Sequence, residues 1–290
     1  MNAASIRPAQ VPCSSRPRTP SERSCLVQNG WCSDDGYGDA VEVNSVARSR
    51  WFAMRLDHPH AEDALVAAGA ALVSGVPSVY VAPNREELPY FLREVDLTYP
   101  SQVTVLEGNP TLGEALARLK PDPTSPGKGE HYDTFVGCLM SGLSQAEYAE
   151  ARSQLQTIDH LLRERVASPH NFCDGIAVKS PTDFEPPRVC LAREIAALMN
   201  SDQCVFYQYD GQSRPSGMWV ELGGALALGK PAVLFTPDLE AVPPSLREGA
   251  PGLRIVEYGS HQELFDGFSR SPEQLRQGHP EDSLDRNRAQ

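Results

Sequence analysis

The 290-residue sequence lacks any apolar run approaching the ~20 residues that a membrane-spanning helix needs. It also has few basic side chains, because 26 Lys and Arg stand against 38 Asp and Glu and give a net charge of −12. This excess of negative charge disfavours contact with the phosphates of nucleic acids. We therefore expect a cytoplasmic protein that binds neither membrane nor nucleic acid and whose partner is a small molecule.

The seven cysteines form no CxxC pair, and their odd number in a chain of this length disfavours a disulfide scaffold. Reduced thiols are the expected state. Cys13, Cys25 and Cys32 lie close in sequence, but no histidine stands near them at the spacing of a zinc site. We predict no metal site and no cofactor.

Composition divides the chain into ordered and disordered parts. Residues 1–38 are rich in Pro, Ser, Arg and Gly without hydrophobic periodicity, which predicts a disordered N-terminal extension. An organellar transit peptide is the alternative for this Arg-rich and Ser-rich segment. Residues 121–130 are typical of a linker, and the polar residues 269–290 predict a disordered tail. The ordered parts are therefore residues 39–120 and 131–268.

Within these parts, short β-rich runs alternate with longer helical patterns. This alternation predicts an α/β fold with a parallel sheet and helices on both faces. Residues 171–185 are irregular and are interpreted as a lid or a substrate loop. We expect helices at residues 40–48, 61–73, 86–93, 112–119, 145–166, 188–199, 240–248 and 261–268, and strands at 51–56, 78–82, 103–106, 132–136, 205–209, 232–235 and 254–258.

The two ordered parts share a repeated pattern. Residues 69–83 (GAALVSGVPSVYVAP) align with residues 223–237 (GGALALGKPAVLFTP) at an offset of 154 residues. The same offset carries Leu92, Arg93 and Glu94 onto a second Leu-Arg-Glu triplet at residues 246–248. We interpret this match as an internal duplication, with chance matching of Ala-rich helices as the alternative.

The first copy lacks the polar chemistry of the second. Ala67 stands where the second copy has Glu221, and Glu62 and Asp63 replace Ser216 and Gly217. No opening strand–helix unit is evident before residue 39. We therefore expect the first copy to be a structural half-domain that extends or covers the second sheet.

Residues 205–236 (VFYQYDGQSRPSGMWVELGGALALGKPAVLFT) are the stretch around which the chain is organised. They predict a strand ending in Asp210, a turn-rich loop, a helix capped by Ser216 and the next parallel strand. Glu221 lies about one turn past the cap. The two carboxyl groups therefore flank the crevice beyond the carboxyl ends of the strands, where ligands bind in open α/β sheets.

This stretch, from Cys204 to Leu234, resembles the signature of nucleoside 2-deoxyribosyltransferases and related nucleotide N-glycosidases. The shared pattern is a hydrophobic strand ending in Asp, a loop, a Ser/Asp-Gly pair with a Glu on the following helix, and Gly-Lys-Pro before a strand. The resemblance covers residues 131–268. It implies a flavodoxin-like parallel sheet, preceded here by a degenerate half-repeat of the same fold.

The resemblance also implies roles for individual residues. Glu221 is the nucleophile that attacks or stabilises C1′ of the sugar, and the helix N-terminus helps to keep it ionised. Asp210 orients Glu221 or the sugar, or carries a proton to the base. The substrate-binding residues that the resemblance and the local pattern suggest are Ser216, Gly217, Gly137, Tyr132, Trp219 and Glu194.

The expected reaction is cleavage or transfer at the N-glycosidic bond of a nucleoside or nucleotide. Pro215 stands where the family's transferases have an acid, and Met218 where Thr is usual, so water in place of an acceptor base is an open alternative. A non-catalytic nucleotide-sensing module, a Toll/interleukin-receptor-like NAD glycohydrolase and a lysine-decarboxylase-like phosphoribohydrolase also stay open. Family members often complete the pocket with a neighbouring subunit. A homo-oligomer or the first half-repeat could serve this purpose here.

Overall fold

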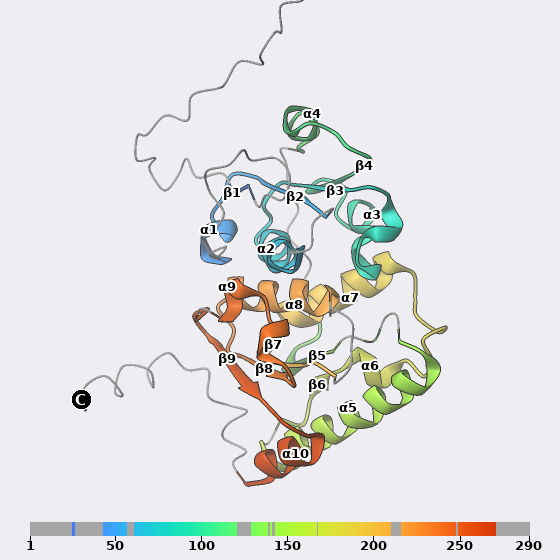
Figure 1. The fold of residues 1–290 in the computed structure, drawn as a ribbon, viewed down its shortest axis with the longest axis vertical. Helices are drawn as coiled ribbons and strands as arrows, with labels where there is room; N and C mark the ends of the chain where they lie inside the picture. The colour runs from blue at the N-terminus through green and yellow to red at the C-terminus, as the bar shows by residue number, and fades with distance from the viewer. Residues whose placement is uncertain are drawn as a thin grey trace, which may run out of the picture.

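The computed structural model describes residues 25–26, 43–56, 61–120, 129–138, 140, 143–166, 168–209, 216–247 and 249–270. Figure 1 shows two sheets, each with helices on both faces, stacked through the helices between them. Strands are parallel throughout both sheets. The predicted α/β class is therefore confirmed.

The second sheet has the order β6-β5-β7-β8-β9, which is the 2-1-3-4-5 order of flavodoxin-like folds. The chain changes direction across this sheet between β5 and β7, so their carboxyl ends form the expected ligand crevice. Its strands are β5 (Tyr132–Cys138), β6 (Asn171–Phe172), β7 (Ser201–Tyr207), β8 (Ala232–Thr236) and β9 (Leu253–Glu257).

The helices of the second half lie on both faces of this sheet, with α5 and α10 on the outer face and α7 and α8 toward the first half (Figure 1). A capping box starts α5, because Ser144 and Glu147 each accept a hydrogen bond from the other's backbone N–H. The helical elements are α5 (Gln145–Arg165), α6 (Asp174–Ala177), α7 (Pro187–Met199), α8 (Ser216–Ala227), η4 (Leu239–Ala241), α9 (Pro244–Arg247) and α10 (His261–Arg270).

The first sheet has the order β1-β2-β3-β4, which matches β5-β7-β8-β9 of the second. Its strands are β1 (Cys25–Leu26), β2 (Phe52–Arg55), β3 (Ser78–Ala82) and β4 (Val103–Glu107). The accompanying helical elements are α1 (Val43–Ala47), α2 (Ala61–Val73), η2 (Arg85–Glu87), η3 (Tyr90–Leu92), α3 (Val95–Thr98) and α4 (Leu112–Leu116).

Strand β1 corrects one expectation. It pairs with β2 as β5 pairs with β7, so the opening strand that seemed absent from the first copy is present. It comes from within residues 1–38, which composition had assigned to a disordered extension. The rest of that segment, most of the 121–130 linker and residues 271–290 lie outside the described residues.

Four other stretches also differ from the expectation. Residues 171–185 contain β6 and α6 rather than only irregular chain, and residues 86–93 form separate 3₁₀ turns. Strand β5 runs on through Gly137 and Cys138, which were expected in a loop. Strand β7 ends at Tyr207, three residues before Asp210.

Helices α2 and α8 contact each other backbone to backbone. A Cβ atom on Gly69 would lie 1.8 Å from the Val220 carbonyl oxygen, and one on Gly223 would lie 1.9 Å from that of Val66. Both pairs are related by the 154-residue offset, so the contact is reciprocal, as in a two-fold symmetric dimer. The duplicated halves therefore pack against each other as pseudo-symmetric partners and share one hydrophobic core.

The C-terminal ends of α2 and α8 also correspond to each other in the two halves. Gly75 and Gly229 follow α2 and α8 with φ of 69° and 68°, a conformation that favours glycine. The backbone N–H groups of Val76 and Lys230 then bond back to Ala71 and Ala225. Both halves thus use the same turn to pass from the shared helix into the next strand.

Replacing Gly223 with Ala should lower the free energy of unfolding by about 3 kcal/mol, because the new methyl group would collide with a backbone carbonyl that cannot rotate away. Urea unfolding of the purified protein measures this loss. Gly113→Ala in α4 is the matched control, since its Cβ would meet nothing within 4 Å. The control should gain up to about 1 kcal/mol from helix propensity. Equal stability of the two variants would contradict the close contact.

Candidate functional site

A cavity of about 60 Å³ lies at the carboxyl end of β5, the strand at which the order of the second sheet reverses, and Phe172 of β6 also lines it. Strand β5 contributes Gly137 and Cys138, α8 contributes Gly217, Met218 and Glu221, and α7 contributes Glu194. One buried water molecule needs ~10–15 Å³ of such space, so this cavity has room for about four water molecules. It accommodates part of a nucleoside-sized ligand, and the rest must lie at the mouth.

Glu221 places its carboxyl group against this cavity. The residue is only 7% exposed, and its Oε2 atom has no hydrogen-bond partner. A Cβ atom on Gly137 would lie 2.7 Å from that oxygen, so the glycine leaves the space that the carboxyl group occupies. A buried, unpartnered carboxyl oxygen is costly unless a ligand or a function requires it.

Glu194 of α7 lines the same cavity, and its carboxyl group lies close enough to that of Glu221 for its charge to raise the pKa of Glu221. Two neighbouring carboxyl groups in a buried site resist being ionised together, so this arrangement favours one shared proton. We refer to Glu194 and Glu221 as the carboxyl pair. The arrangement can supply one proton and one negative charge at the same place, as acid–base catalysis requires.

The surroundings favour the protonated form of the carboxyl pair. Burial raises the pKa of Glu221 well above its ordinary value, and the charge and hydrogen bond of Glu194 and the charge of Asp174 raise it further. Burial and then the charge of Asp174 raise the pKa of Glu194 to about 8, while its hydrogen bond to Glu221 opposes this rise. Burial and the neighbouring acids thus oppose the expected effect of the helix N-terminus, which was to keep Glu221 ionised.

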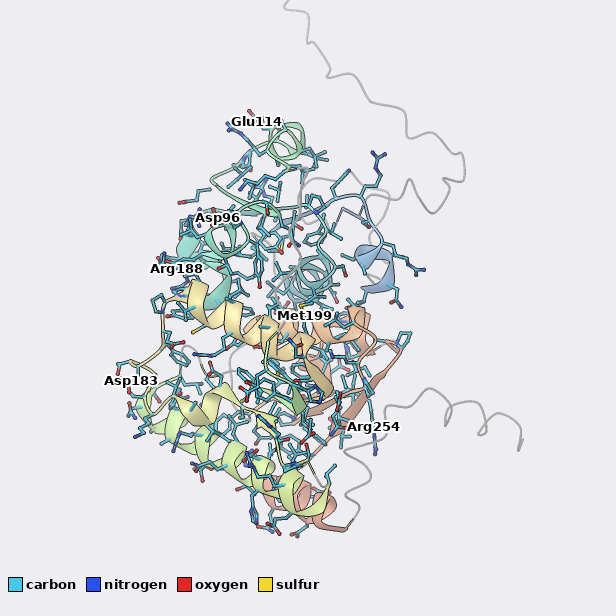
Figure 2. All side chains as sticks on the ribbon, turned by 180° about the vertical axis from the view of Figure 1, so that it is seen from behind. Asp96, Glu114, Asp183, Arg188, Met199 and Arg254 are labelled. Carbon is cyan, nitrogen blue, oxygen red and sulfur yellow. The ribbon has the colours of Figure 1, made fainter. Side chains whose placement is uncertain are left out.

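A covering segment, residues 173–186, closes one side of the cavity with Asp174, Gly175 and Phe184. Arg193 of α7 holds it, because its Nη2 atom lies 2.5 Å from Oδ2 of Asp174 and its Nη1 atom also bonds to Glu185. Figure 2 shows α7 between Arg188 and Met199, with Asp183 in the segment that precedes it. The segment that the sequence interprets as a lid or a substrate loop thus lines the cavity.

The first half completes the site. Tyr90 and Phe91 of η3 line the cavity, and Phe91 lies against Gly217 at the start of α8. The Tyr90 hydroxyl donates to the carbonyl oxygen of Glu185 at 2.7 Å, and its ring lies 5.8 Å from that of Phe184. The half-repeat therefore contributes cavity wall, as a neighbouring subunit does in the family that the sequence resembles.

Some predicted site residues lie together and others do not. Gly137, Gly217, Glu194 and Glu221 all line the cavity. Ser216 begins α8, but nothing is described of its side chain, and Asp210 lies outside the described residues.

The predictions that Tyr132 and Trp219 bind substrate are corrected by the structure. Tyr132 lies at the amino end of β5, away from the cavity, where its ring packs edge-on against His170 and Phe172. Trp219 is fully buried in the core between the two halves, because its position on α8 turns it away from Glu221. The structure therefore supports the interpretation of Trp219 as a core residue, and not as a residue that stacks on the ring of a ligand.

Sequence reasoning missed Asp174, Arg193, Tyr90 and Phe91. Asp174 and Arg193 are 19 residues apart, and no local spacing links them. Tyr90 and Phe91 fall in the half that was expected to lack chemistry. The aligned Leu-Arg-Glu triplet directly after them showed that this turn is retained in both copies, but not that it reaches the other copy's crevice.

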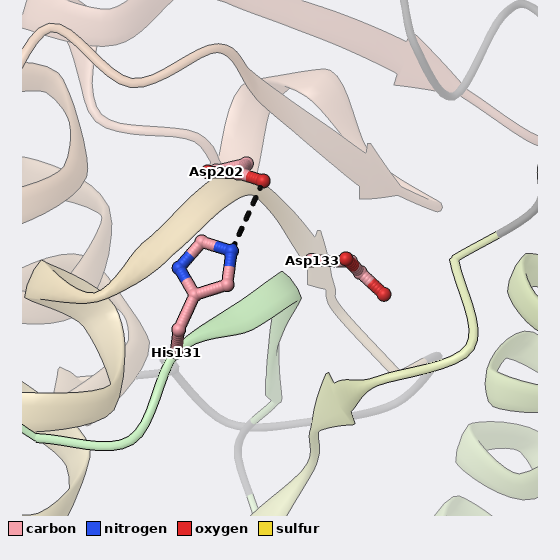
Figure 3. Close-up of side chains that lie close together, drawn as sticks. All are labelled: His131, Asp133 and Asp202. Atoms are coloured by element: carbon pink, nitrogen blue, oxygen red, sulfur yellow. Dashed lines mark ion pairs between the residues drawn. The ribbon is translucent and has the colours of Figure 1, made fainter.

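A second polar cluster lies at the amino ends of β5 and β7, at the opposite end of the strands from the cavity. His131, Asp133 and Asp202 bring three donor atoms within 4.8 Å of one another (Figure 3). Internal contacts account for this arrangement, since His131 pairs with Asp202 at 3.4 Å and Asp133 accepts the backbone N–H of His170 at 2.8 Å. We assign it no metal.

No family model, curated protein or solved structure matches this chain. The resemblance to nucleoside 2-deoxyribosyltransferases therefore stays a prediction. In the described part of the chain, none of the helices combines the length and the apolar character needed to cross a membrane.

The stability of the protein should depend on the carboxyl pair. Because the folded-state pKa of Glu194 and Glu221 lies above that of an unfolded glutamate, folding is favoured at low pH and weakened as pH rises from about 4.3 through about 8. Glu194→Gln should flatten this slope and raise the unfolding free energy at pH 8.5 by on the order of 1–3 kcal/mol. Urea titrations at pH 5, 7 and 8.5 measure it.

Glu164→Gln, on the exposed surface of α5, is the matched control and should follow the wild type at every pH. A Glu194→Gln variant with the wild-type slope would show that the pair does not hold its proton in the folded state.

Proposed function

We propose that this protein cleaves or transfers the N-glycosidic bond of a nucleoside or nucleotide. The observation that carries the proposal is the carboxyl pair: Glu221, nine-tenths buried, presents an unpartnered oxygen to a cavity at the switch point of the sheet. Glu194 lines the same cavity, and its charge raises the pKa of Glu221. The resemblance of residues 204–234 to N-glycosidases gives independent support.

The chemistry that fits this pair can be followed atom by atom. When the base–sugar bond breaks, its electrons go to the base nitrogen and positive charge develops on C1′ of the sugar. The shared proton passes to the base nitrogen by way of Glu194, and the Glu221 carboxylate then bonds to C1′ or stabilises its charge. Water or a second base attacks C1′ next and releases the Glu221 carboxylate where it has bonded there, and the proton that the attacking group loses returns to the pair.

The apolar walls assist in this scheme. Phe135 and Phe172 are stacked with ring centroids 5.4 Å apart and both line the cavity, so they offer a surface to a planar base. Low polarity around the pair also strengthens the interaction between a carboxylate and the developing positive charge. Gly217 and the start of α8 would face the sugar side of the substrate.

Glu221→Gln should reduce base release by about 10³-fold or more, because the amide can neither bond to C1′ nor return a proton. Wild type, Glu221→Gln and the surface control Glu164→Gln would be incubated with nucleosides, nucleotides and NAD, with and without a second free base. Chromatography of the released base measures cleavage, and the appearance of a new nucleoside measures transfer.

Base release that survives Glu221→Gln removes Glu221 from the reaction. If the wild type binds nucleosides but releases base from none of the substrates, the function is that of a non-catalytic nucleotide-binding module.

A further inference from the structure

The cavity has an unbalanced charge. Asp174, Glu194 and Glu221 line it, and among the described lining residues there is no Lys, Arg or His. The guanidinium of Arg193 is bound to Asp174 and Glu185, and that of Arg93 lies 5.8 Å from the ring centre of Tyr90. Arg193 therefore faces two carboxylates and the carboxyl pair, so this group of side chains keeps an excess of negative charge even with a proton on the pair.

Aromatic rings surround this negative centre. Phe135 and Phe172 form one wall, and Tyr90 and Phe184 form another with ring centroids 5.8 Å apart. The faces of aromatic rings attract cations, and the attraction is strongest where water is excluded. Carboxyl groups enclosed by aromatic faces suit a flat, positively charged ligand better than a neutral or anionic one.

We propose that this cavity selects a heterocycle that carries a positive charge, such as a pyridinium or an N-methylated purine ring, over the neutral ring of the same shape. The proposal rests on the proposed function in one respect, namely that the charged ring is the leaving base of an N-glycoside. It thereby names the substrate class of the same site.

Binding of such a cation has a measurable consequence. The groups that face Glu221 are Glu194, Asp174 and the thiols of Cys138, Cys173 and Cys204, with Arg193 held beyond Asp174. Burial raises the pKa of all three thiols, so they stay neutral. The acids are thus the groups that respond to the cation, and the pair should release its proton to solvent.

A cationic base also simplifies the reaction. When the bond from C1′ to the ring nitrogen breaks, its electron pair neutralises the charge of the ring, and the base leaves as a neutral molecule without a proton. The pair, already ionised by the bound cation, supplies the Glu221 carboxylate to C1′. Water then attacks C1′ and gives its proton to the pair.

Isothermal titration calorimetry with 1-methylnicotinamide and nicotinamide tests the proposal, since these two probes differ by one methyl group and one positive charge. The cation should bind at least about tenfold more tightly at pH 7. Its binding heat should vary between buffers of different ionisation enthalpy, which reports the release of up to one proton. Glu194→Gln should lose the proton release, whereas Glu164→Gln should keep it, with thermal unfolding confirming that both variants fold.

Equal binding of the two probes, or tighter binding of nicotinamide, overturns the proposal. So does cleavage of guanosine with no cleavage of 7-methylguanosine, although the proposed N-glycosidase function then stands. Preferential binding of the cation without cleavage of any riboside supports the charge selection and removes the proposed function.

Discussion

The backbone contact between α2 and α8 is the constraint on which the arrangement of the site depends. Gly69 and Gly223 let two helices from different halves touch at their carbonyl groups. Glu221 lies two residues before Gly223 on α8, and the same contact brings η3 of the first half to the start of that helix. A side chain at either glycine would separate the helices and with them the two walls of the cavity.

The carboxyl pair adds an electrostatic constraint. Two acids in contact inside an apolar cavity destabilise the folded state whenever both are ionised, and neither finds a basic partner among the described lining residues. Titratable groups with strongly raised pKa values in a cleft are typical of functional sites. The neighbouring ion pairs of Arg193 hold the covering segment in place, and the charge of Arg193 only partly offsets the rise in the pKa of Glu194.

The duplication explains how one half came to serve the other. Reciprocal positions in the two copies have diverged: Phe91 packs on Gly217, whereas their counterparts Ser245 and Asp63 are joined by hydrogen bonds, with Ser245 N–H 3.1 Å from Asp63 Oδ1. The same contact is thus apolar at the cavity and polar on the other side of the pseudo-two-fold axis. The first half keeps the packing surface of the fold and contributes aromatic wall without a carboxyl group of its own.

Local sequence patterns were enough to predict many of the helices and strands and part of the candidate site. The bounds of α2 and β3 agree with the expectation because Gly75 and Pro77 end one element before the next begins. The resemblance to a known family suggested Glu194 and Gly137. The β–α alternation determined the parallel sheets, and the strand-to-helix stretch pointed to Glu221 and Gly217 at the crevice. These conclusions depend on residues close in sequence or on rules of sheet topology.

Only the tertiary structure decided which side chains meet. It turned Trp219 into the core, left Tyr132 at the far end of its strand, and brought Tyr90 to a cavity of the other half. It also decided that the pKa of Glu221 is raised, because desolvation and the charge of a neighbouring acid depend on distances between elements far apart in the chain. The spacing of residues in the sequence predicts the period of a helix, but it does not predict which residues of other elements lie beside that helix in the folded chain.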